Sequence, residues 1–98
     1  MKKTHKKIDN QLRHALTNAC EEIKDSFEEF AWLTHQVNFE QFPQSLRVNC
    51  FFSNSSSLLD ATNSETCAII GQIIKVHLSK IAITKFDDSK QITFNSED

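Results

Sequence analysis

The sequence predicts an α+β protein: a two-layer sandwich in the order α-β-β-α-β-β, with two helices on one face of a four-stranded, mainly antiparallel sheet. In residues 5–27, and again in a segment ending near residue 79, apolar side chains recur every three or four positions, as on the buried side of a helix. In residues 30–39 and 46–53 apolar side chains instead alternate, as on strands. An antiparallel sheet covered on one side leaves its other face open to solvent.

The first helix is predicted over about residues 5–27, with Thr4 as a candidate N-cap. A single apolar stripe runs along it, as expected of a helix that packs one side against a core. The stripe consists of Ile8, Leu12, Ala15, Leu16, Ala19, Ile23 and Phe27.

Two alternating runs joined by a short loop that contains Pro43 then predict an antiparallel hairpin. In the first strand, the core side is predicted to carry Ala31, Leu33, His35, Val37 and Phe39, and the open side Phe30, Trp32, Thr34, Gln36 and Asn38. In the second strand, the core side is predicted to carry Leu46, Val48, Cys50 and Phe52, and the open side Arg47, Asn49 and Phe51.

The second helix is predicted to end near Ser79, and its start has two candidates. Ser57 with Asp60 and Thr62 with Glu65 both fit a capping box. The inward stripe of this helix is predicted to be Thr66, Ile69, Ile70, Ile73, Ile74, His77 and Leu78.

Two short strands, residues 81–86 and 91–95, are expected to follow around a turn at residues 87–90. With the earlier elements they predict one core. Its members are Leu12, Leu16, Ile23, Leu33, Val37, Val48, Phe52, Ile70, Ile73, Ile83, Ile92 and Phe94.

Length and composition indicate a single domain over residues 1–98, with a basic tail at residues 1–7 and an acidic tail at residues 95–98. The apolar content of 39% and the charged content of 24% are close to the globular average and argue against disorder. The net charge of −2 predicts no overall attraction to nucleic acid or to a membrane. No apolar run is long enough for a signal peptide or a membrane span.

The three cysteines are Cys20, Cys50 and Cys67. They form no CxxC pair and fall among apolar residues, which predicts reduced thiols in a cytoplasmic protein.

The open sheet face is the strongest candidate for function. Exposed aromatic side chains beside an arginine are typical of protein interfaces, so the leading hypothesis is a non-enzymatic module that binds a protein partner or associates with itself, for example as a dimer. A loop or the C-terminal tail covering the aromatic rings is the structural alternative. The candidate interaction residues are Trp32, Arg47, Phe51 and Phe86.

A basic N-terminus supports a second hypothesis, a nucleic-acid-associated accessory or regulatory protein. Lys2, Lys3, Lys6 and Lys7 are the candidate phosphate-binding residues. They lie where a helix dipole is positive, so helix stability does not explain them. A solvated tail is the simpler interpretation, because a few terminal lysines are weak evidence for nucleic-acid binding.

A third hypothesis is a small enzyme or ligand-binding domain with a pocket near His35. No catalytic or cofactor motif supports it: the chain has one glycine, which excludes a glycine-rich phosphate loop. His5, His14, His35 and His77 have no metal-ligand spacing, so no metal, cofactor or catalytic residue is predicted. Cys67 is expected near the start of the second helix, where a helix dipole lowers a thiol pKa, but a packed thiol is the favoured interpretation.

Residues 30–48, FAWLTHQVNFEQFPQSLRV, and the preceding IDNQLRHALTNACEEI resemble a small family of uncharacterised bacterial proteins of similar length. Some members carry a label that implies similarity to the Fis transcriptional regulators. Fis-like proteins end in a basic helix-turn-helix, whereas this chain is predicted to end in a hairpin and the acidic residues NSED. The resemblance implies no site residues.

Overall fold

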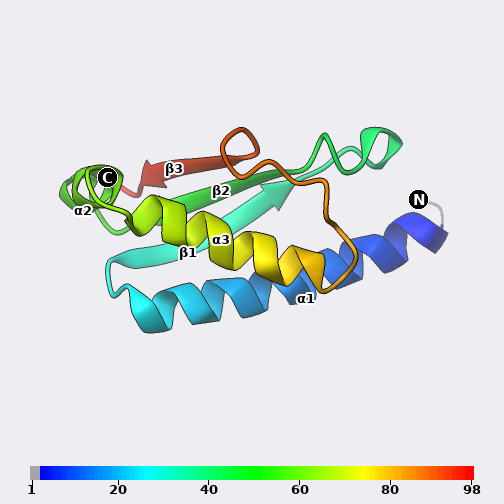
Figure 1. Cartoon of the computed structure of the whole chain (residues 1–98), viewed down its shortest axis with the longest axis horizontal. Coiled ribbons are helices and arrows are strands. Elements are labelled where there is room, and N and C mark those ends of the chain that lie inside the picture. Colours follow the sequence, from blue (N-terminus) through cyan, green and yellow to red (C-terminus); the bar gives the residue numbers. More distant parts are fainter. Residues whose placement is uncertain (1–2) are drawn as a thin grey trace.

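The computed structural model describes residues 3–98, with side chains from Lys6 onward. Within this range the chain forms three α-helices, one short 3-10 helix and a three-stranded sheet (Figure 1). The elements are α1 (Lys3–Ser26), β1 (Phe30–Gln36), η1 (Phe39–Gln41), β2 (Arg47–Phe52), α2 (Ser55–Thr62), α3 (Thr66–Ser79) and β3 (Ile92–Ser96). The α+β class is confirmed, but the predicted four-stranded sheet and the order α-β-β-α-β-β are wrong.

The missing strand is the segment 81–86. Here backbone N–H groups bond to the last turn of α3 instead of to a neighbouring strand. Ile83 N donates to Leu78 O at 3.0 Å, and Ala82 has a positive φ of 66°, so the chain turns sharply away from the helix. These bonds use the donors that a strand needs, and the expected C-terminal hairpin does not form.

The direction of β3 also differs from the prediction. Strand β2 lies between its two neighbours, pairing antiparallel with β1 and parallel with β3. Helix α2 lies at one end of the sheet, and α3 carries the chain back along it before β3 begins (Figure 1). A parallel pair requires such a long crossover, whereas a tight turn would give an antiparallel pair.

An irregularity at the start of β1 changes the face of one aromatic residue. Phe30 lies opposite Phe52 and Trp32 lies opposite Phe51, so Ala31 is an extra residue in the strand, as in a β-bulge. Phe30, expected on the open face, is instead buried and packs edge-on against Phe52, with ring centroids 5.8 Å apart.

The predicted second helix is two helices separated by residues 63–65. Helix α2 starts after Asn54, whose side chain accepts a hydrogen bond from Ser57 N, so neither predicted capping box begins it. Helix α3 buries Ile70 and Ile74 but leaves Ile69 and Val76 largely exposed. The expectation that Ile69 faces inward is therefore wrong.

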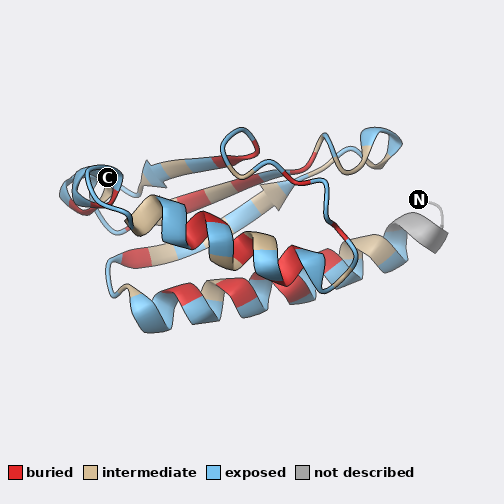
Figure 2. Cartoon of the chain, viewed as in Figure 1, coloured by how far each residue is buried: buried red, intermediate tan, exposed pale blue. Residues whose placement is uncertain are grey.

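The core lies between the sheet and helices α1 and α3, which show their buried sides to it (Figure 2). Of the predicted core residues, Leu33, Val37, Ile73 and Phe94 are only partly buried and pack against its edge. The others are buried, as predicted: Leu12, Leu16, Ile23, Val48, Phe52, Ile70, Ile83 and Ile92. No helix in residues 3–98 is long and apolar enough to cross a membrane.

A buried glutamine joins the two long loops. Gln91, at the start of the predicted last strand, is only 7% exposed. Its Nε2 donates to the carbonyl oxygens of Pro43 and Leu46, each at 2.9 Å, and its Oε1 accepts from Asp87 N at 2.9 Å. This side chain therefore pairs three backbone groups that precede β2 and β3.

We expect Gln91→Leu to lower the free energy of unfolding by about 1–3 kcal/mol, because buried backbone groups lose their partner. Chemical denaturation followed by circular dichroism measures the change. The matched control is Gln44→Leu, at an exposed glutamine in the same region, which should change stability by less than about 0.5 kcal/mol. Equal effects of the two substitutions would contradict the role assigned to Gln91.

Candidate functional site on the open face of the sheet

The open face is formed by the residues of the three strands that point away from α1 and α3. Strand register places these residues in rows that cross the sheet. The first row is Trp32, Phe51 and Asn95, the second is Thr34, Asn49 and Thr93, and the third contains Gln36 and Arg47. All are exposed or half-buried, in contrast to Val48, Cys50 and Phe52 on the covered face of β2.

Trp32 forms the most prominent feature of this face. Its indole stacks on the ring of Phe51, with centroids 4.1 Å apart and an interplanar angle of 11°. Trp32 Nε1 donates to Glu97 Oε1 at 2.8 Å, so the end of the chain holds the polar edge of the ring. The indole nevertheless remains 41% exposed. The predicted faces of Trp32 and Phe51 are therefore confirmed, and the C-terminal segment holds the indole without burying it.

Arg47 lies on the same face but at the opposite end. It pairs with Gln36, four residues along β2 from Phe51, which corresponds to about 13 Å in a strand. Its Nη1 donates to the carbonyl oxygens of Gln44, at 2.7 Å, and Leu46, at 3.0 Å. The guanidinium is thus held near its own backbone and does not reach Trp32 of the same chain.

The row between these two ends is polar and uncharged. Thr93 Oγ1 donates to Asn49 Oδ1 at 2.7 Å, and Asn95 Nδ2 donates to Thr93 Oγ1 at 3.3 Å. These bonds link β2 and β3 on the open side. The face therefore has an acidic and aromatic end, a neutral middle and a basic end.

The expectation that Phe86 belongs to this face is wrong. Phe86 is only 3% exposed and lies in the loop between α3 and β3, where it joins the core. No strand forms at residues 81–86, so the alternation that placed Phe86 beside Trp32 does not exist.

The two predicted phosphate-binding lysines whose side chains are described, Lys6 and Lys7, lie on α1 and not on the sheet. Lys2 lies outside the described residues, and Lys3 begins α1, although its side chain is not described. Lys6 and Lys7 are exposed in the first turns of α1, so residues 3–7 are helical rather than a tail. Because α1 packs on the covered face of the sheet, Lys6 and Lys7 do not join Arg47.

The histidines with described partners each bind a carboxylate of α1. His77 Nε2 lies 2.9 Å from Glu22 Oε1, and His35 Nε2 lies 3.7 Å from Asp9 Oδ1. Asp9 and Glu22 are thirteen positions apart on α1, about 20 Å along the axis, so the two histidines do not act together. Among the described residues, no group of three or more potential ligands is placed to hold a metal ion.

Burial makes two of the thiols, Cys50 and Cys67, poor nucleophiles. Burial raises the pKa of Cys50 to about 12. Burial also raises the pKa of Cys67, and a hydrogen bond with Thr62 opposes this shift only partly. This direction agrees with the favoured interpretation of Cys67 as a packed thiol, because desolvation by burial is the largest cause of the shift.

A cavity of about 340 Å³ does lie near His35, between α1 and β1. Arg13, Thr17, Cys20 and Leu33 are among its other lining residues. Its charged lining residues include both signs, so it shows no electrostatic preference for one class of ligand.

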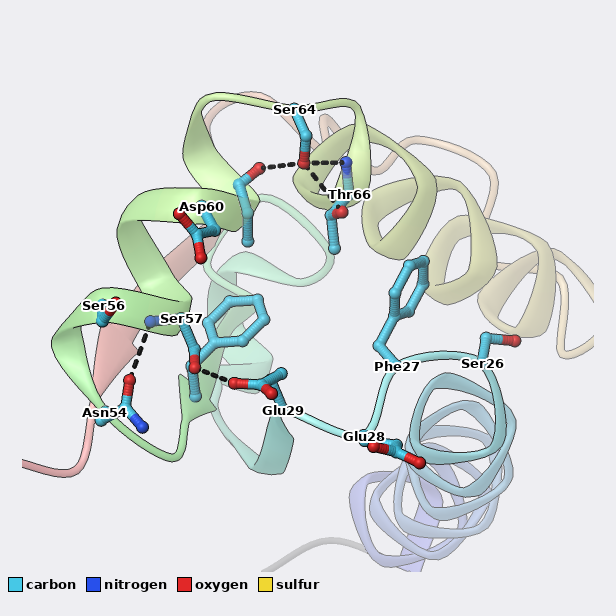
Figure 3. Close-up of a pocket in the computed structure, with 12 residues that line it drawn as sticks. Ser26, Phe27, Glu28, Glu29, Asn54, Ser56, Ser57, Asp60, Ser64 and Thr66 are labelled. Carbon is cyan, nitrogen blue, oxygen red and sulfur yellow. Dashed lines mark hydrogen bonds between the residues drawn. The ribbon is translucent and has the colours of Figure 1, made fainter.

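Sequence reasoning missed a larger pocket of about 620 Å³, between the end of α1 and helix α2 (Figure 3). The ring of Phe27 lies beside it, and Glu29 accepts a hydrogen bond from the Ser57 hydroxyl. Its lining has carboxylates and hydroxyls but no basic side chain. The cap formed by Asn54 on Ser57 is the one local signal for this site, and it predicts a helix start rather than a pocket.

Comparison of this chain with protein-family models, with curated proteins and with solved structures gives no match.

Proposed function

We propose that this protein is a non-enzymatic binding module that holds another protein through the open face of its sheet, with Trp32 as its main aromatic contact. The observation that carries this proposal is the indole that is 41% exposed while it is stacked on Phe51. Tryptophan and arginine are enriched at protein interfaces and contribute a large share of their binding energy. An aromatic pair fixed in one orientation loses little conformational entropy on binding.

Binding to a protein explains this face better than binding to nucleic acid. Proteins that bind single-stranded RNA on a sheet stack several bases on separate aromatic rings and hold phosphates with basic side chains. Here Trp32 and Phe51 cover one another, and Arg47 is the basic residue in the three rows. Lys6 and Lys7 lie on α1, away from this surface. With three free cysteines in the chain, we expect the module to work in a reducing compartment, the cytoplasm.

Site-specific photo-crosslinking tests the proposal. A benzophenone amino acid at Gln36, on the open face, should give discrete protein adducts in the native cell that resist nuclease. The same group at Leu59, which is 60% exposed on α2, is the control and should give none above background. Adducts that nuclease removes would favour the nucleic-acid hypothesis, and an absence of adducts at Gln36 would contradict the proposal.

We expect Trp32→Ala to weaken the complex about 30-fold or more, because a tryptophan that dominates an interface contributes about 2 kcal/mol or more to it. The folded monomer should survive, because the substitution removes one aromatic stack and one exposed hydrogen bond, together about 1–3 kcal/mol. Isothermal titration or sedimentation measures the affinity, and circular dichroism checks the fold. Leu59→Ala should leave the affinity unchanged. If Trp32→Ala unfolds the monomer, the indole is structural and the proposal fails.

A further inference from the structure

We infer that the occupant of the open face is a second copy of this chain, packed face to face about a two-fold axis, with Arg47 of each copy on the exposed Trp32 ring of the other. This inference rests on the proposed function and identifies its partner.

The two ends of the face are complementary to each other, so two copies match when one is turned end for end. Trp32, Phe51 and Glu97 lie at one end and Arg47 lies at the other, about 13 Å away along β2. The two-fold axis lies midway between the two sheets, perpendicular to the strands and over Asn49. Rotation about this axis reverses the strand direction of one copy relative to the other. Each Arg47 then faces the aromatic end of the other copy, and both contacts form at once. Closed two-fold pairing of this kind is the commonest symmetry of soluble oligomers.

The groups that meet at each end have matching chemistry. The outer face of the indole is free to accept a guanidinium in a cation–π contact. Glu97 uses Oε1 for the indole N–H, so its other carboxylate oxygen can accept from an arginine. Nη1 of Arg47 is occupied by backbone carbonyls, whereas its Nε and Nη2 groups make no hydrogen bond with the described residues. The unused donors of Arg47 therefore match the unused acceptor of Glu97.

The middle of the face permits close approach. Thr34, Asn49 and Thr93 are uncharged and bond partly among themselves, so no like charges meet at the axis. Two packed sheets lie about 10 Å apart, a gap that one Trp or Arg side chain can span. The face has three short strands, so we expect it to bury less than the roughly 800 Å² per partner of a standard interface. We therefore expect a reversible dimer with a dissociation constant on the order of 10 µM.

Charge reversal tests this arrangement. Arg47→Glu should place two carboxylates together at each contact, and Glu97→Arg should place two guanidinium groups together. In sedimentation, each variant alone should dimerise about 10-fold or more weakly than the unaltered protein. An equimolar mixture should recover dimers, because the heterodimer has one reversed and one original Arg–Glu contact. Lys85→Glu, in the exposed loop after α3, is the control and should dimerise normally.

The outcomes separate this inference from the proposed function. Suppose that the protein stays monomeric at 1 mM, roughly 100 times the expected dissociation constant, while the Gln36 crosslinker still captures a different protein. The inference that the partner is a second copy is then wrong, and the proposed binding face is retained. A monomer without adducts overturns both. The two-fold arrangement is wrong if both charge-reversal variants dimerise as well as the unaltered protein. It is also wrong if their equimolar mixture does not recover dimers. Native-like circular dichroism of each variant confirms that lost dimerisation is not lost folding.

Discussion

Replacing Ile70 with alanine should lower the free energy of unfolding by about 2–5 kcal/mol. Ile70 is fully buried in α3, in the core that this helix shares with α1 and the sheet. The loss combines the transfer free energy of the removed methyl and methylene groups with the cost of the cavity, because a close-packed core relaxes only partly. Denaturant unfolding followed by circular dichroism measures this change.

The neighbouring Ile69 provides a matched control with the same chemistry. Ile69 is 43% exposed, so Ile69→Ala removes less buried surface and should cost less than about 1 kcal/mol. The comparison isolates burial, since both substitutions change helix propensity in the same way. Similar losses of unfolding free energy at the two positions would show that α3 does not bury Ile70 while exposing Ile69.

Alkaline pH should destabilise the fold through Cys50. Burial raises the pKa of this thiol from 9.0 to about 12, so between these values the unfolded chain loses the thiol proton while the folded chain retains it. The stabilisation is complete below pH 9 and is lost as the pH rises toward 12. Well inside this window each pH unit should cost roughly 1 kcal/mol.

Cys50→Val tests the origin of the alkaline slope. Valine has a similar size and no ionisable group, and position 50 lies on the buried face of β2 between Val48 and Phe52. Denaturant unfolding at about pH 8.5, 9.5 and 10.5 covers the lower part of this window. The free energy of unfolding should fall more steeply with pH for the original protein than for the variant. Parallel slopes would show that other groups cause the loss.

The sequence alone determined the parts of this protein that depend on local periodicity. The apolar stripe of α1 buries Leu12 and Ile23 as predicted, because a long amphipathic helix has one side that must be buried. The alternation in β2 correctly placed Val48 on the core side and Arg47 on the open side. Trp32 was placed correctly for the same reason, so three of the four candidate interaction residues lie on the open face.

Other features depended on contacts between distant residues. The extra residue Ala31 turned Phe30 into the core, although strict alternation assigns it to the open face. The side chain of Gln91 is buried because the carbonyl groups of Pro43 and Leu46, more than forty positions earlier, need a donor. Neither effect leaves a signal in a short sequence window.

Only the tertiary structure decided how the last third of the chain is used. Ile83 and Phe86 are apolar at positions that also fit a strand, but the core accepts both from a loop whose backbone bonds to the end of α3. Strand β3 then pairs in parallel with β2, and this places Glu97 beside the indole of Trp32. Hydrophobic periodicity specifies which side of an element is buried, whereas the partner and direction of a strand depend on backbone pairing over long sequence distances.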